Sequence, residues 1–317
     1  MRLDEFDPSA NTRDLGSGGG GGFGIGGGGG GSAGLFGLLF NFLPLLLGRR
    51  LGCGAMLLIG VVGFFLLNSG LFSSGLSGPS SGVPATQAGG RTAGGGNVVG
   101  DTPEELFGAR VLASTEQVWG QIFQQQGSRY QPTTLNFYSR STQSGCGAAQ
   151  SAMGPFYCPS DQGVYLDTDF FRELSQRFGA AGDAAQAYVI SHEVGHHIQT
   201  ITGVSDQVRR AQSRASQTQG NQLQVRMELQ ADCYAGVWAS RARTPRTNQP
   251  VMEQGDLEEA MRAAQAIGDD TLMQNAGRRV QPESFTHGTS AQRMRWLQRG
   301  YQTGDPRQCD TFQAASL

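Results

Sequence analysis

Residues 184–200 read AAQAYVISHEVGHHIQT and hold three of the four histidines in a chain of 317 residues. Apolar residues recur here at helical spacing, so we expect a helix over residues 183–202 that ends at Gly203. His192 and His196 are four positions apart and therefore share one helix face, one turn from each other. Two imidazoles in that arrangement can bind a single zinc ion through bonds of about 2.0–2.1 Å.

Glu193 is rotated from His192 by about 100° around the helix. We expect its carboxylate to lie beside the open position of the metal, where it can take a proton from a bound water. Zinc lowers the pKa of such a water towards about 7, which makes hydroxide available at neutral pH. Gly195 lacks a side chain and would let another chain segment approach. His197 points about 100° away from His196, so we expect it to pack or to support the site rather than to bind the metal.

A third protein ligand is expected in the segment ELQAD at residues 228–232. Glu228 and Asp232 are again four apart on a predicted helix, so Glu228 can bind the metal while Asp232 accepts the free ring N–H of a ligand histidine. The alternative for both motifs is a set of solvated side chains on surface helices. The apolar stretches AAQAYVIS and ADCYAGVWA argue against it, because an acid in such surroundings is costly unless it is paired.

HEVGHH followed by ELQADCYAGVWA resembles the bacterial "putative neutral zinc metallopeptidase" family, and GCGAAQSAMGPFYCPSDQGVYLD and FTHGTSAQRMRWL resemble the same pattern. More broadly, the chain is similar to metallopeptidases that combine HExxH with a downstream ExxxD. The resemblance implies a zincin-like domain that binds Zn²⁺ and cleaves peptide bonds. It implies zinc ligands at His192, His196 and Glu228, and a catalytic base at Glu193.

His287 precedes a helix predicted over residues 289–300. It is the one histidine left to donate a hydrogen bond to the oxyanion that builds up when an amide is attacked. The resemblance supports that catalytic role, and the alternative is a histidine that caps or packs against the helix. Arg293 and Arg295 lie on the same helix. A solvated position is the default expectation for both, and the alternative is that one of them reaches the cleft.

The amino-acid composition differs between the first hundred residues and the rest of the chain. A formal net charge of −2 leaves no basic footprint, so we exclude nucleic acid as a partner. Many of the 49 glycines fall early, and we expect residues 1–33 to form a disordered, Gly-rich cytoplasmic segment. Residues 70–100 are rich in Gly, Ser, Ala, Thr and Pro and are expected to form a flexible linker. The enzyme domain is expected over residues 101–317.

Residues 34–69 form an apolar region with a predicted transmembrane helix at about 51–68 (LGCGAMLLIGVVGFFLLN). Arg49 and Arg50 precede this stretch directly, and the next basic residue is Arg91. That asymmetry predicts a single-pass inner-membrane protein with a cytoplasmic N-terminus and a periplasmic or extracellular domain. Residues 34–47 are also apolar but short, and Asn41 and Pro44 interrupt them, so we expect an interfacial or loosely buried segment there. The alternatives are a cleaved signal peptide and a two-span hairpin that also uses residues 34–47, which would place the enzyme inside.

Within the domain, Thr102 is expected to cap a helix over residues 103–125. TLNFYSR and GVYLD are the better strand candidates, in a turn-rich stretch over residues 133–166. The fold class is therefore α+β, helix-dominated with a small β-sheet. Further helices are expected over residues 168–178, 221–243 and 256–268, and residues 205–219 are expected to form a helical excursion or a mobile loop.

Cys53 lies in the apolar region, and the other four cysteines lie in the domain without a CxxC pair. Four cysteines allow three pairings; we prefer Cys146 with Cys158 and Cys233 with Cys309, as expected in an oxidising compartment. Four buried free thiols are the alternative. The segment GCGAAQSAMGPFYC is expected to offer an edge strand to an extended peptide, or to be a disulfide-closed hairpin.

The sequence therefore predicts a membrane-anchored zinc metalloendopeptidase that acts on protein or peptide substrates. Two alternatives are kept. One is a non-catalytic, membrane-tethered zinc-binding interaction module, which the intact Glu193 argues against. The other is a zinc amidase that acts on non-peptide amides.

Overall fold

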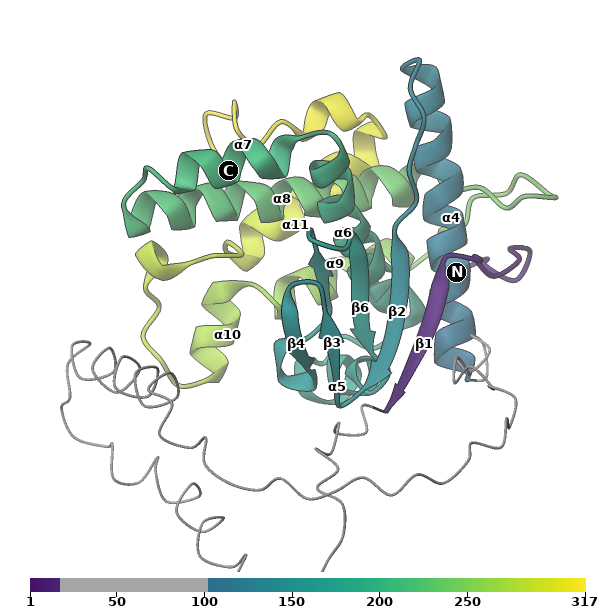
Figure 1. Cartoon of the computed structure of the whole chain (residues 1–317), viewed down its shortest axis with the longest axis horizontal. Coiled ribbons are helices and arrows are strands. Elements are labelled where there is room, and N and C mark those ends of the chain that lie inside the picture. Colours follow the sequence, from purple (N-terminus) through teal and green to yellow (C-terminus); the bar gives the residue numbers. More distant parts are fainter. Residues whose placement is uncertain (18–101) are drawn as a thin grey trace, which may run out of the picture. The chain divides into compact units, whose positions relative to one another are not determined.

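A computed structural model of the chain describes residues 1–17 and 102–317. Helices dominate these residues, and the strands form one four-stranded and one two-stranded sheet (Figure 1), so the predicted α+β class is confirmed. The predicted transmembrane helix at 51–68, the apolar region 34–69 and the linker 70–100 lie outside the described residues. Among the described residues, no helix has the length and apolar character needed to cross a membrane.

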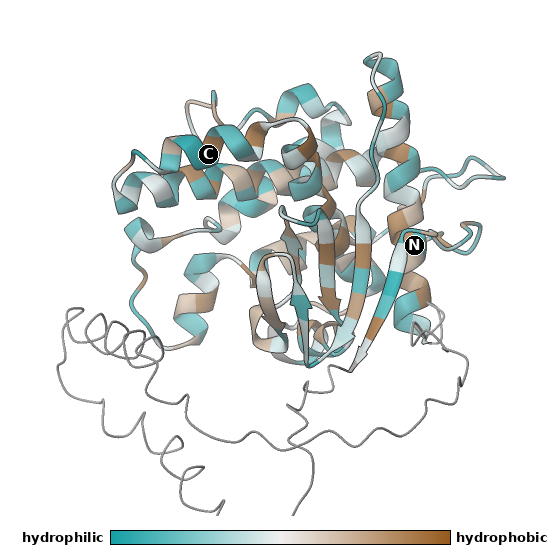
Figure 2. Ribbon diagram, in the orientation of Figure 1, coloured by the Kyte–Doolittle hydropathy of each residue, from teal (hydrophilic) through white to brown (hydrophobic). Residues whose placement is uncertain are grey.

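The larger sheet has the strand order β1-β2-β6-β5. Strands β1 (Thr12–Ser17), β2 (Thr134–Ser139) and β6 (Gly163–Asp167) run parallel, and β5 (Phe156–Cys158) pairs antiparallel with β6 at the edge. Hydrophobic residues concentrate on β2 and β6 (Figure 2), as expected for strands buried in the interior of a sheet. The smaller sheet is the hairpin of β3 (Ser141–Ser144) and β4 (Gly147–Gln150).

The first 17 residues belong to the folded domain. Leu3 and Phe6 are buried in its core, the N–H of Arg2 donates to the carbonyl of Val251 at 2.9 Å, and Thr12 is paired with Leu135. The prediction of disorder over residues 1–33 is therefore wrong for residues 1–17. The glycine bias misled it, because this segment holds a single glycine and its backbone also bonds to residues far along the chain, in β2 and at Ala109 and Val251.

Most predicted helices are confirmed within a few residues. Thr102 caps α4 (Pro103–Gln125) by accepting the N–H of Glu105. The polar stretch after Gly203 forms the short helix α7 (Val204–Gln212). The other helices are α5 (Phe170–Phe178), α6 (Asp183–Ile201), α8 (Gln217–Arg241), α9 (Asp256–Ala266), α10 (Asp269–Asn275) and α11 (Ser290–Thr303), with 3₁₀ turns at Ser151–Met153, Pro282–Ser284 and Pro306–Cys309.

Helices α6, α8 and α11 approach one another closely where glycines replace side chains. A Cβ on Gly195 of α6 would lie 3.0 Å from the Cα of Ala231 on α8, so the expected close approach at this glycine is observed. Gly236 of α8 and Gly300 of α11 leave no room for a Cβ against the facing backbone. The Gly195 contact sets the distance between α6 and α8, and with it the distance between the two predicted metal-binding motifs, while the Gly236 and Gly300 contacts bring α11 close to α8.

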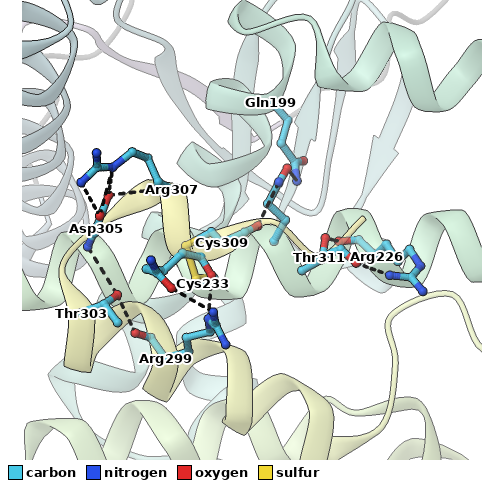
Figure 3. Close-up of a disulfide and its surroundings, with 11 residues drawn as sticks. Gln199, Arg226, Cys233, Arg299, Thr303, Asp305, Arg307, Cys309 and Thr311 are labelled. Atoms are coloured by element: carbon cyan, nitrogen blue, oxygen red, sulfur yellow. Dashed lines mark hydrogen bonds and ion pairs between the residues drawn. A yellow bond between two sulfur atoms is a disulfide. The ribbon is translucent and has the colours of Figure 1, made fainter. Parts of the chain in front are cut away.

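Both preferred disulfides are present, so the free-thiol alternative is wrong. Cys146–Cys158 joins the β3–β4 turn to β5, and Cys233–Cys309 joins α8 to the C-terminal 3₁₀ turn (Figure 3). The loss of one native disulfide commonly costs about 2–5 kcal/mol in a small secreted domain. Both bonds therefore tie outlying segments to the elements that carry the candidate site.

Candidate metal centre

Three donor atoms from α6 and α8 converge on one point. The Nε2 atom of His192 lies 3.2 Å from Oε2 of Glu228, and Nε2 of His196 lies 3.5 Å from the same oxygen. Ligands at the corners of a tetrahedron with bonds of 2.0–2.1 Å stand about 3.3–3.4 Å apart. The spacing and the donor types therefore fit zinc, with one coordination position left for a non-protein ligand.

His192 is oriented by Asp232. The Nδ1 atom of the imidazole donates to Oδ1 of the carboxylate at 2.8 Å, which leaves the Nε2 lone pair directed at the metal position. The hydroxyl of Tyr188 donates to the same oxygen at 2.5 Å. The structure thus places Asp232 beside a ligand histidine, as the four-residue spacing from Glu228 predicts.

Arg293 is buried against the same carboxylate and lines the cleft, so the default of a solvated side chain is wrong for it and the alternative that one arginine reaches the cleft is confirmed. Its Nε and one terminal nitrogen each donate to Asp232 at 2.9 Å, and that terminal nitrogen also donates to Tyr188 at 3.1 Å. Burial raises the pKa of Asp232, but the charge of Arg293 and the hydrogen bonds from His192 and Arg293 outweigh it and lower the pKa to about 2. Asp232 is therefore a fixed anion whose charge a buried guanidinium balances.

His196 has a partner that the sequence analysis missed. Its Nδ1 atom donates to Oε1 of Gln199 at 2.9 Å. The amide nitrogen of Gln199 donates in turn to the carbonyl of Met227 at 2.7 Å and to Oε1 of Gln230 at 3.1 Å. Gln230 donates to the carbonyl of Cys309 at 3.0 Å. Hydrogen bonds therefore run from the disulfide through Gln230 and Gln199 to His196; Figure 3 shows Gln199 and Cys309 at the disulfide end. The signal available in the sequence was the three-residue spacing from His196.

Glu193 lies in the wall of a cleft of about 1080 Å³ that the three donors also line. Its side chain is buried, and it is not one of the three donors that converge. The structure therefore separates Glu193 from the metal-binding positions and leaves it facing the same space. The side-chain amide of Gln224 donates to the other carboxylate oxygen of Glu228, Oε1, at 2.9 Å.

His287 also lines the cleft, and its imidazole is about half exposed. Its Nδ1 atom lies 3.2 Å from Oδ1 of Asp269. The hydrogen bond to Asp269 raises the pKa of His287 above its ordinary value. The structure therefore places His287 in the cleft wall with an aspartate behind it.

His197 lies away from the metal position, as its helical direction predicts. Its Nε2 donates to the carbonyl of Gln131 at 2.6 Å, and Nδ1 accepts the hydroxyl of Tyr157 at 3.2 Å. Burial lowers its pKa, which favours the neutral imidazole that can serve as donor and acceptor at once. His197 thus joins α6 to the edge strand β5.

These features define a protein with an HExxH metal centre completed by a glutamate from a second helix. The chain belongs to the family described as "Putative neutral zinc metallopeptidase", whose model matches residues 1–312. Zn²⁺ is the metal that the family implies, and the donor set at His192, His196 and Glu228 fits it. The family match begins at residue 1, which agrees with the place of β1 in the domain.

Two relatives show how far this likeness extends. The chain is 48% identical over 263 residues to the uncharacterized protein YpfJ of Escherichia coli K12, covering 82% of this chain and 87% of that protein. It is 45% identical over 218 residues to the uncharacterized protein Rv2575 of Mycobacterium tuberculosis H37Rv, covering 66% and 71%. No solved structure matches the chain.

Proposed function

We propose that the protein is a membrane-anchored zinc metalloendopeptidase that hydrolyses peptide bonds in protein or peptide substrates. The observation that carries the proposal is the presence of Glu193 in the wall of the cleft onto which the three zinc-type donors open. Zinc bound there would polarise a peptide carbonyl and acidify the attacking water. Glu193 accepts a proton from that water and returns it to the departing amine.

His287 would stabilise the negative charge that develops on the substrate during the reaction. Attack on an amide places negative charge on its carbonyl oxygen, and a hydrogen-bond donor in the cleft stabilises that charge. The raised pKa of His287, caused by Asp269, favours the protonated ring that can donate from both nitrogens. His287 therefore pairs with Glu193 as donor and base in the proposed reaction.

The edge strand β5 supports a peptide as the substrate. Phe156 and Tyr157 of this strand line the cleft, and β5 has a sheet neighbour on one side, β6. An extended peptide can add to such an edge through main-chain hydrogen bonds. The cleft also reaches Ser205 and Arg209 of α7, so a chain has room to continue past the metal, which favours cleavage within a polypeptide.

The test compares Glu193→Gln with the unaltered protein. We expect both to bind one equivalent of zinc, and we expect only the unaltered protein to cleave unfolded casein, with activity lost on chelation and restored by zinc. Loss of the general base should lower kcat at least about 100-fold. If both bind zinc and neither cleaves casein or a mixed peptide library, a non-catalytic module or an amidase on non-peptide amides replaces the proposal.

Membrane attachment through residues 51–68 is part of the proposal and is supported by the apolar, uncharged sequence of that stretch. Separation of the full chain with the membrane fraction, and its release by detergent but not by high salt or carbonate, is the expected result. Recovery in the soluble fraction would remove the anchor from the proposal and leave the peptidase activity untouched.

A further inference from the structure

Residues 1–17 are an integral part of the domain formed by residues 102–317. Strand β1 forms one edge of the larger sheet and pairs with β2. The side chains of Ser9 and Asn11 both donate to Glu116 of α4 at 2.8 Å. Glu5 accepts the backbone N–H groups of Arg246 and Thr247, each at 3.0 Å. A segment held by main-chain pairing and a buried core cannot lie on the far side of a bilayer from the rest of its fold.

We infer that residues 18–101 cross the membrane an even number of times, so that residues 1–17 and the peptidase domain lie on the same side of it. The chain leaves the domain after Ser17 and re-enters it at Thr102, and one span between these points would separate β1 from β2. This inference rests on strand pairing and is independent of the proposed activity. It replaces the single-pass arrangement that the charge asymmetry predicts.

The side of the membrane follows from two further observations. Disulfides Cys146–Cys158 and Cys233–Cys309 fit an oxidising compartment and therefore the outer side. Arg49 and Arg50 lie between the apolar stretches 34–47 and 51–68, and basic residues between two spans favour the cytoplasm. Both observations point to a hairpin whose turn is cytoplasmic and whose two ends are outside.

The length of the first apolar stretch is consistent with a hairpin only if the bilayer adapts. Residues 34–47 would extend about 21 Å as a helix, against a hydrocarbon core of about 30 Å. Short segments are accommodated by local thinning of the bilayer or by extension of flanking small residues into it, at a modest cost per ångström. Gly31, Ser32 and Ala33 precede this stretch, so its effective length can increase without burying a charge.

Thiol labelling of the full chain tests the inference. In a Cys53→Ala background, the remaining natural cysteines are in disulfides, and two single cysteines are compared: Ala10→Cys at an exposed position before β1 and Gln302→Cys at an exposed position on α11. Spheroplasts of a bacterial host are treated with a membrane-impermeant maleimide before and after permeabilisation. Glu193→Gln is included so that self-cleavage does not confuse the labelling.

Labelling of both cysteines in intact spheroplasts is the expected result, with less than a twofold increase on permeabilisation. Labelling of Gln302→Cys alone would overturn the inference, because it would place residue 10 in the cytoplasm and restore a single span. If both cysteines are protected until permeabilisation, the even number of membrane crossings stands, but the placement of the domain on the outer side of the membrane is overturned. Zinc content and far-UV circular dichroism of each purified variant confirm that the reporter cysteines leave the fold intact.

A separate observation concerns Asp269, at the start of α10. It accepts the backbone N–H groups of Thr286 and His287, each at 2.7 Å, and that of Gly288 at 3.1 Å, while its other oxygen contacts the His287 ring. The carboxylate is buried, whereas the imidazole it contacts is exposed to the cleft. Four contacts on one carboxylate exceed what a helix cap requires, since three of them hold the loop that carries His287.

We propose that Asp269 is a positioning residue that fixes the orientation of His287 by accepting its Nδ1–H, so that Nε2–H of the protonated ring faces the cleft. This rests on the proposed function, in which His287 donates to the oxyanion. With Nδ1–H engaged by Asp269, the second N–H of the protonated imidazole, at Nε2, is free to serve as the donor. Asp269 itself has no contact with the three metal-binding side chains among the described residues.

A double-mutant cycle in the zinc-loaded protein tests this role. Asp269→Asn should lower kcat about tenfold with KM and zinc content unchanged, and His287→Ala should lower it further. The double variant should match His287→Ala within twofold, because Asp269 acts through His287. Multiplicative losses in the double variant would overturn the positioning role. Retained activity in Glu193→Gln would instead count against the proposed function, so the two failures are distinct.

Discussion

Two histidines of the cleft, His192 and His287, each have an aspartate at Nδ1, yet their surroundings differ. The Asp232 partner of His192 is fully buried and is clamped by Arg293 and Tyr188. The Asp269 partner of His287 is held by backbone N–H groups of one loop, and the His287 ring is about half exposed. The same pair of side chains thus occurs once between three packed helices and once on a loop.

The difference matches the tasks proposed for the two rings. A metal ligand must keep one geometry whether or not substrate is present, and a rigid, desolvated clamp provides this. A donor to a developing oxyanion must meet a substrate that arrives from solvent. An exposed ring whose Nδ1 is held in place by Asp269 is suitable for this. The following predictions test this contrast.

The largest effect is expected from Asp232→Ala. It leaves Arg293 as a buried charge without its partner, and breaking a buried pair in this way costs about 3–5 kcal/mol. Urea denaturation of the metal-free protein measures the loss without a contribution from zinc. Asp269→Ala is the matched control, with an expected loss of about 1–3 kcal/mol, since its partners can reach water. Equal losses of unfolding free energy in the two variants would contradict the proposed difference between the two aspartates.

An intermediate effect is expected from Gln199→Ala, which removes the acceptor for Nδ1 of His196 and leaves the carbonyl of Met227 without its amide donor. We expect the affinity for zinc to fall about 10–100-fold. Competition with a chromophoric chelator measures the change. Gln222→Ala on the exposed face of α8 serves as the control and should leave the zinc affinity unchanged. A similar fall in zinc affinity for Gln222→Ala would show that any substitution in α8 weakens zinc binding, and that Gln199 has no specific role.

The smallest effect is a pH dependence of stability that depends on His287. Asp269 raises the pKa of the folded imidazole above its unfolded value of about 6.5. Its stabilising contribution is therefore fully present below that unfolded value and is lost as the pH rises through the higher folded value. In metal-free protein, the difference in unfolding free energy between the unaltered chain and His287→Gln should shrink between pH 6 and 9. A constant difference would show that the ring does not titrate against Asp269.

Short-range patterns predicted much of this molecule. The apolar spacing around HEVGHH located α6 and its end at Gly203, and Thr102-Pro103 located the start of α4. The four-residue spacings placed His192 with His196 and Glu228 with Asp232 on single faces. These features depend on dihedral angles and hydrogen bonds within one turn of helix, and such interactions are visible in a few consecutive residues.

Contacts between distant segments were not predictable in the same way. Arg293 looked like a surface residue because its helix is polar, yet α11 turns it towards Asp232, 61 residues away. Strand β1 was missed because its partner, β2, begins more than a hundred residues later. Helix α10 was missed because seven residues give little periodicity.

The sequence by itself determined the zinc-type donors, the glutamate beside them and the helices that carry both, because one turn of helix fixes the spacing of side chains four residues apart. Only the tertiary structure decided which charges balance the site and which side of the cleft His287 occupies. It also decided that the chain's first residues belong to the same fold as its last. Those outcomes depend on burial and on pairing between segments far apart in the chain, where many alternative partners have the same local pattern.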